Sequence, residues 1–106
     1  MDTQTFSALA EPRRLQIIEL LREQSCSVND IAERLKIRQP QASKHLHALH
    51  KAKLVNVQPA AQRRIYSLNH EPFLQLDNWL DSFNDYWTTR LNRLDSYLKA
   101  EGDKSE

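Results

Sequence analysis

The sequence is short of three features that often decide the class of a protein: glycine, cysteine and long apolar runs. It contains one glycine and one cysteine in 106 residues. A single cysteine, Cys26, excludes an intramolecular disulfide and favours the cytoplasm. No apolar run approaches the roughly 18 residues that suggest a membrane span, and the N-terminal stretch lacks the basic start and apolar block of a secretory signal. The composition therefore predicts a cytoplasmic, mainly helical chain without a membrane partner.

Acidic residues are absent from one long segment. Between Arg34 and His70 there is no Asp or Glu, although the whole chain contains 14. The same segment contains all four histidines and eight of the 15 lysines and arginines, namely Arg34, Lys36, Arg38, Lys44, Lys51, Lys53, Arg63 and Arg64. Chance clustering on a solvated surface is the simple alternative. A basic region kept apart from the acidic residues nevertheless favours a polyanionic partner.

The spacing of apolar residues predicts short helices, a two-stranded ribbon and a long last helix. Ser27 and Asp30 have the spacing of a capping box at the start of the third helix. Pro40 is tolerated in the first turn of the fourth. The helices are expected over 3–10, 12–23, 27–35, 39–52 and 71–99, and the strands over 54–58 and 63–68. The length predicts one domain, 1–100, followed by a polar tail, 101–106.

The expected last helix, 71–99, contains six of the eight aromatic residues. Its apolar residues recur every three or four positions. A helix of nearly 30 residues is about 43 Å long, whereas a single domain of this size is roughly 26 Å across. Part of the apolar face should therefore be covered by a second chain, although folding back as ordinary core is the alternative.

Three histidines, His45, His47 and His50, lie within six residues and suggest a metal site. On a helix with about 100° per residue, His45 and His47 point roughly 160° apart and cannot share an ion. His47 and His50 would supply half of a tetrahedral zinc site, with no Cys, Asp or Glu nearby in sequence. No nucleophile–base pair or phosphate-cradling glycine loop is present either. The sequence therefore predicts no metal, no other cofactor and no enzyme activity.

The fourth helix has an outer face suited to nucleic acid. Ala42, Leu46 and Leu49 form its buried stripe, and the opposite face offers donors and acceptors to base edges and cations to phosphates. That face and its edge contain Gln41, Ser43, Lys44, His47 and Lys51. The preceding helix would brace it across the groove, while Arg63 and Arg64 on the ribbon would reach nearby phosphates. The predicted fold is a winged helix-turn-helix, mainly α with a small β-ribbon, in the order α-α-α-α-β-β-α. A merely solvated helix is the alternative.

The segments "FSALAEPRRLQIIELL", "VNDIAERLKIRQPQASKHLHALHKAKLV" and "RRIYSLN" resemble the ArsR-type winged helix-turn-helix transcriptional repressors. The resemblance extends from about Phe6 to Tyr97. It implies a symmetric homodimer that binds a partly palindromic operator in double-stranded DNA and represses transcription. The dimer would join through the first and last helices. The interface residues are then Phe6, Leu9, Trp79, Phe83, Tyr86, Trp87, Leu91 and Leu94.

The resemblance also implies which residues contact DNA. The start of the family's recognition helix falls on Gln39, Ser43 and Lys44, and Gln41 and His47 lie on or beside the same outer face. These five are expected to face bases or nearby phosphates in the major groove. The residues expected to bind mainly phosphates are Arg38, Lys51, Arg63 and Arg64.

The sequence departs from the family pattern where many members sense metal. Their Cys-x-Cys pair at the start of the third helix is replaced by Ser27 and Asn29. Other members bind zinc with Asp and His on the last helix, which here has no histidine beyond His70. Cys26 lies one place away from the pair and is expected to be a small buried residue. The chain therefore resembles a non-metal-sensing branch of the family.

Two further departures concern the ends of elements. Arg38 replaces the usual serine cap of the recognition helix, and Ala61 replaces the glycine often found at the wing tip.

Two alternatives to the operator-binding repressor stay open: a winged-helix module for protein contact, and a repressor that responds to a thiol oxidant or a small molecule. The sequence identifies neither an effector nor an operator.

Overall fold

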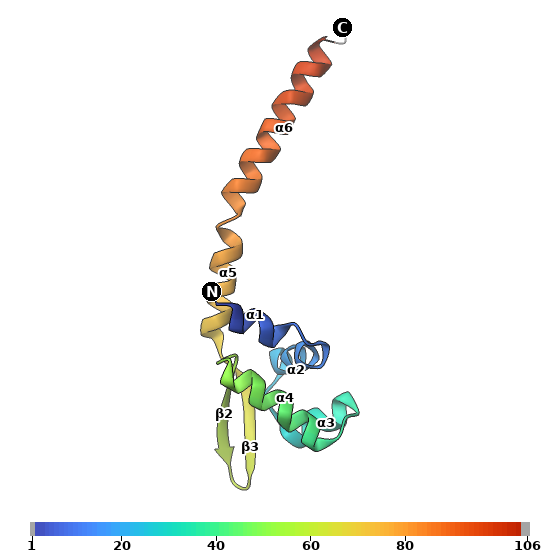
Figure 1. The fold of residues 1–106 in the computed structure, drawn as a ribbon, viewed down its shortest axis with the longest axis vertical. Coiled ribbons are helices and arrows are strands. Elements are labelled where there is room, and N and C mark those ends of the chain that lie inside the picture. The colour runs from blue at the N-terminus through green and yellow to red at the C-terminus, as the bar shows by residue number, and fades with distance from the viewer. Residues whose placement is uncertain (1, 105–106) are drawn as a thin grey trace. The chain divides into compact units, whose positions relative to one another are not determined.

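The computed structural model describes residues 2–104, with only the backbone described for 101–104. Its elements, labelled in Figure 1, are α1 (Thr3–Leu9), α2 (Pro12–Glu23), β1 (Cys26–Ser27), α3 (Val28–Leu35), α4 (Gln39–Lys51), β2 (Val55–Ala60), β3 (Arg63–Leu68), α5 (His70–Asp81) and α6 (Asn84–Lys104). They form two compact units, Met1–Leu74 and Gln75–Glu106. The mainly helical winged helix-turn-helix fold predicted from the sequence is confirmed, and its predicted order gains the strand β1 and a division of the last helix into α5 and α6. Among residues 2–104, no helix has the length and apolar character that a membrane span requires.

Side chains cap the short helices of the first unit. Ser27 Oγ accepts a hydrogen bond from the backbone N–H of Asp30 at 3.2 Å, and Asp30 Oδ2 accepts one from the backbone N–H of Ser27 at 3.1 Å. This reciprocal pair is the capping box predicted at the start of α3. At the start of α2, the Glu11 carboxylate accepts from the backbone N–H of Arg14 at 3.0 Å. These caps set where α2 and α3 begin.

The sheet has three antiparallel strands in the order β1-β3-β2, one strand more than the predicted ribbon. In the additional strand, Cys26 pairs with Tyr66 and Ser27 pairs with Ile65. Two residues are too few to show an alternating pattern, so sequence periodicity could not reveal this strand. β2 and β3, joined by the turn at 61–62, form the predicted wing.

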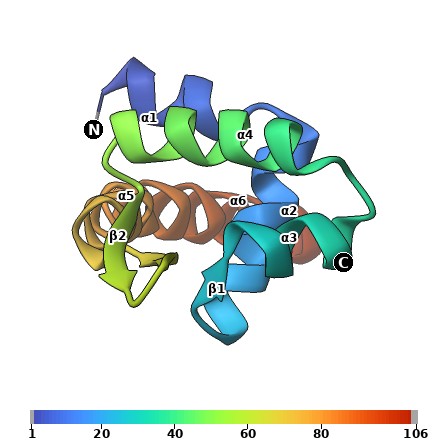
Figure 2. The same ribbon diagram turned by 90° about the horizontal axis from the view of Figure 1, so that it is seen from below.

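The core of the first unit lies beneath α4. Ala42, Leu46 and Leu49, the stripe predicted from helical spacing, are all 0% exposed. They belong to one apolar cluster with the equally buried Ile17 and Ile31. Figure 2 shows α4 running beside α1, with α2 and α3 on its other side. Burying each large apolar side chain contributes about 1.5–3 kcal/mol, so the buried face of α4 holds its outer face in place.

The long last helix is interrupted. The sequence predicts one helix over 71–99, whereas α5 and α6 are separated by Ser82 and Phe83. The Ser82 hydroxyl donates a hydrogen bond to the carbonyl oxygen of Trp79, and a serine bonded to its own backbone in this way competes with the helix. α6 continues to Lys104, so the backbone of 101–104 is helical where the sequence predicts a polar tail. Residues 105 and 106 lie outside the described residues.

Candidate nucleic-acid interface

The outer face of α4 brings the predicted contact residues together on one exposed surface. This outer face consists of Arg38, Gln39, Gln41, Ser43, Lys44, His47 and Lys51, all of which are exposed. No acidic residue occurs in α4 or in its N-cap position. The surface therefore combines three cations with short polar side chains and has no carboxylate of its own to repel phosphate.

The N-terminus of α4 is capped by its own third residue. The Arg38 side chain makes no capping hydrogen bond. Instead, Gln41 Oε1 accepts a hydrogen bond from the backbone N–H of Arg38 at 3.4 Å. This bond is long and solvent-exposed, so it holds Gln41 weakly and leaves its amide N–H groups as donors. Replacing the usual serine with Arg38 thus weakens the cap and adds a cation beside the outer face.

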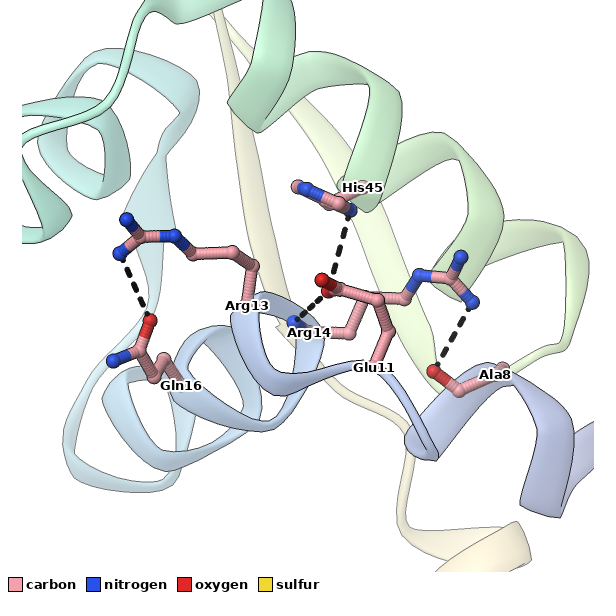
Figure 3. A network of polar contacts seen from close by, with 6 residues as sticks. All are labelled: Ala8, Glu11, Arg13, Arg14, Gln16 and His45. Carbon is pink, nitrogen blue, oxygen red and sulfur yellow. Dashed lines mark hydrogen bonds and ion pairs between the residues drawn. The ribbon is translucent and has the colours of Figure 1, made fainter.

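His45 is separated from the other two histidines, as helical geometry predicts. His47 and His50 are exposed, whereas the His45 side chain is only 20% exposed. His45 Nδ1 lies 3.7 Å from Glu11 Oε2, and the Arg14 guanidinium donates a hydrogen bond to the carbonyl oxygen of Ala8 at 3.2 Å. Figure 3 shows the His45–Glu11 contact between α4 and the N-cap of α2, and beside it the Arg14–Ala8 hydrogen bond between α2 and α1. His45 therefore lies beside Glu11, away from the outer face of α4.

The wing places its two arginines beside a strained turn. Arg63 pairs with Ala60 and Arg64 pairs with Pro59 at the end of the ribbon. Both arginines are exposed. Ala61 has φ 57°, in the left-handed region that favours glycine. Within the described range neither arginine forms an ion pair, so both guanidinium groups can bind an anion without first breaking a salt bridge.

Asn69 holds the junction between α4 and the wing, a role that the sequence did not reveal. Asn69 Nδ2 donates to the carbonyl oxygen of Lys53 at 2.8 Å, and its backbone N–H donates to the carbonyl oxygen of Leu54 at 3.0 Å. Lys53 has φ 63°, a conformation that is costly for a residue with a side chain. Asn69 Oδ1 also accepts a hydrogen bond from the backbone N–H of Glu71 at 3.4 Å, at the start of α5. The bond to Lys53 depends on the sheet bringing two distant segments together.

Neither the thiol nor the histidines form a metal-binding cluster. Cys26 is 1% exposed, and burial raises the pKa of its thiol. A redox switch needs an accessible thiol with a lowered pKa. In the part of the chain that the structure describes, no group of three or more His, Cys, Asp or Glu side chains could hold a metal ion. The chemistry of this surface is therefore that of cations and polar side chains.

The second unit exposes a row of large apolar side chains. The six dimer residues predicted on the last helix are 37% to 64% exposed, namely Trp79, Phe83, Tyr86, Trp87, Leu91 and Leu94. Of the two predicted on α1, Phe6 is 40% exposed and Leu9 is half-buried against the core of the first unit. An exposed apolar surface of this extent is typical of a contact site.

Comparison with known sequences relates this chain to bacterial regulators. Residues 11–57 match the family described as "Bacterial regulatory protein, arsR family". The HTH-type transcriptional regulator Rv2034 of Mycobacterium tuberculosis is 35% identical over 98 residues, which cover 92% of this chain and 89% of that protein. The transcriptional repressor SdpR of Bacillus subtilis is 33% identical over 78 residues, 74% of this chain and 87% of SdpR.

A solved structure extends the comparison to the fold. It is the homodimeric winged helix-turn-helix DNA-binding domain of Mb0332 from Mycobacterium bovis, described as a possible ArsR-family transcriptional regulator. The two chains superpose with a TM-score of 0.66 at 30% identity, over 78% of this chain and 77% of that one. The similarity therefore includes most of both chains.

Proposed function

The chain belongs to the arsR family of bacterial regulatory proteins, and from this premise we propose that it is a homodimeric repressor that binds a partly palindromic DNA operator. It acts in the cytoplasm and is not an enzyme. The observation that carries the proposal is the outer face of α4, which is exposed, free of carboxylates and held in place by three fully buried residues. Occupying the operator would block access of the transcription machinery.

The outer face of α4 enters the major groove. Gln39, Gln41, Ser43, Lys44 and His47 face base edges or nearby phosphates, since amide, hydroxyl and imidazole groups supply short donors and acceptors. Arg38 and Lys51 at the two ends of the helix and Arg63 and Arg64 on the wing bind phosphates. The phosphate contacts set the position of the helix, and the base contacts choose the sequence.

The homodimer forms through the exposed apolar residues of the second unit, together with Phe6 and Leu9 of α1. The support is the row of large exposed apolar side chains on the second unit, such as Leu91 at 64% and Leu94 at 54%, and the homodimeric state of the related Mb0332 domain. Two recognition helices would then lie about 34–36 Å apart, one turn of DNA. This spacing makes a two-fold symmetric operator the natural target.

The protein works without a bound metal or other cofactor. Ser27 and Asn29 occupy the positions where the resemblance places metal-binding cysteines, and neither supplies a thiolate. The raised pKa of the buried Cys26 thiol argues against a redox switch. Zinc and mild oxidants should therefore leave operator affinity unchanged.

The test is selection of bound duplexes from a random pool by the purified chain. We expect enrichment of a symmetric site whose half-sites are about 10–10.5 base pairs apart. Gln41→Ala or Ser43→Ala should change the enriched sequence, whereas Lys51→Ala should weaken all duplexes alike. If no duplex is bound more tightly than random DNA at physiological salt, the proposal is wrong. Capture of one acidic protein by the same basic face would then favour the protein-contact module.

A further inference from the structure

A cleft lies between the wing and the start of α3. The pairing of β1 with β3 ends at Ser27 and Ile65. Val28 and Asn29, which follow Ser27 in the chain, belong to α3 and not to the sheet. On the other side of the pairing, Arg64 and Arg63 precede Ile65 in β3. The opening has a volume of about 240 Å³ and is lined by Ser27, Val28, Asn29, Gln62, Arg63 and Arg64. Two segments far apart in sequence thus form one polar cleft.

The cleft has an excess of positive charge. The guanidinium groups of Arg63 and Arg64 meet no ion-pair partner within 4.0 Å among the side chains of residues 2–100. The nearby carboxylate is that of Asp30, whose pKa is lowered mainly by hydrogen bonds from Ser27 and further by the charges of Arg63 and Arg34. One oxygen of this carboxylate is already used in the capping box. Arg63 and Arg64 thus line the cleft together, and no carboxylate is among its lining residues, so an anion can bind there.

The remaining lining groups are donors of the right kind. Asn29 and Gln62 carry side-chain amide N–H groups, and both residues are exposed at the cleft. Guanidinium groups suit phosphate because their N–H donors match two oxygens at once. A divalent cation does not suit a site with two arginines, and a base edge would not use both of them. The chemistry of the cleft is therefore that of a phosphate group.

We propose that this cleft binds one backbone phosphate of the operator, held by Arg63 and Arg64 from the wing and by the side-chain amides of Asn29 and Gln62. The inference rests on the proposed function and adds Asn29 and Gln62 to the DNA contacts. Because the phosphate bridges α3 and the wing tip, binding fixes the wing relative to the helix-turn-helix. Free phosphate has the same chemistry, so the experiment must distinguish the two sources.

The duplex experiment replaces single phosphates of the selected operator with neutral methylphosphonates. For the wild-type chain, one position in each half-site should weaken binding by about tenfold. Asn29→Ala and Arg63→Ala should each weaken binding of the unmodified duplex, by about fivefold and about tenfold. Both variants should then lose less than about twofold at that one position and as much as wild type elsewhere. Asn56→Ala, an exposed asparagine on β2 outside the cleft, is the matched control and should respond like wild type.

Two results would overturn the proposal that α3 and the wing bind the same phosphate. Asn29→Ala could respond like wild type at every modified position, or Asn29 and Arg63 could map to different phosphates. In either case the operator is still bound, so the proposed phosphate site in the cleft is wrong and the proposed function stands. If the wild-type chain selects no operator, the proposed function fails, and the DNA phosphate with it.

A titration with inorganic phosphate tests the cleft without DNA. The side-chain amide NMR signals of Asn29 and Gln62 should shift with phosphate more than with chloride at equal ionic strength. Arg63→Ala should abolish the difference, while the amide of Asn56 should not respond. Equal shifts with both salts would contradict an anion site between the wing and α3.

Discussion

The two units of the chain use the same kind of apolar pattern with opposite results. In the first unit, the stripe of α4 is 0% exposed because α2 and α3 pack against it. In the second unit, apolar residues with similar spacing are exposed, up to 64% for Leu91. Helical periodicity therefore indicates which face needs covering, but not which chain covers it. The first unit has a basic surface on a buried core, and we propose that the second offers its apolar surface to another copy of the chain.

The largest expected effect is on the core of the first unit. Leu46→Ala should lower the free energy of unfolding by about 2–5 kcal/mol, because it leaves a cavity under α4. Leu91→Ala in dilute, monomeric protein should cost less than about 0.5 kcal/mol, since that side chain is already in water. Denaturation with urea measures both. Equal losses would remove the distinction between the two units.

The next effect concerns the partner of the second unit. Leu94→Asp should raise the dissociation constant of the dimer by about a hundredfold, because it places a charge in an apolar contact. Ser96→Asp is the matched control, as two residues along a helix correspond to about 200° of rotation. Sedimentation equilibrium measures both constants. A wild-type mass near 12.4 kDa at micromolar concentration would contradict the dimer.

A smaller effect is expected at the wing tip. Ala61→Gly should stabilise the fold by about 1 kcal/mol, because Ala61 has φ 57° and glycine adopts this conformation without a clash. Ala60→Gly, one residue earlier in β2, should instead destabilise it slightly, since glycine weakens a strand. Thermal unfolding of the two variants gives the comparison. A loss of stability in Ala61→Gly would show that the turn is not strained.

The smallest effect is the pH dependence of the α3 cap. Asp30 has a lowered pKa, first because of the hydrogen bonds from Ser27 and then because of Arg63 and Arg34. Its contribution to stability is therefore present above the unfolded pKa and is lost as pH falls through the lower folded value. Ser27→Ala should return the Asp30 pKa toward its ordinary value more than Arg63→Ala does. An NMR titration that follows the Asp30 carboxyl carbon measures the pKa in each variant. A larger change in Arg63→Ala than in Ser27→Ala would show that charge dominates over the hydrogen bonds.

Much of the first unit could be predicted because its signals are local. The capping box of Ser27 and Asp30 and the stripe on α4 need only neighbouring residues, and both are confirmed. The two-residue strand β1 could not be predicted, since its pairing partner lies far along the chain. The break at Ser82 was missed because the apolar spacing continues through it and only the serine hydroxyl reveals the competition.

The candidate site could be predicted to a similar extent. The outer face of α4 follows from 100° per residue, so helical arithmetic was sufficient to group its residues. The roles assigned to those residues stay predictions. The contact between His45 and Glu11 was missed because it joins two helices. Asn29 and Gln62 were missed because only the register of β1 and β3 brings them to one cleft.

The most direct test of the central claim is the salt dependence of operator binding by three proteins. The wild-type chain is compared with Lys51→Ala, at the end of α4, and with Lys99→Ala, an exposed lysine on α6 that pairs with Asp95. The account predicts that Lys51→Ala lowers the slope of log affinity against log salt by about 0.9 per bound protomer. Lys99→Ala should leave the slope unchanged. Identical slopes for all three proteins would contradict the claim that the basic surface of the first unit binds the operator.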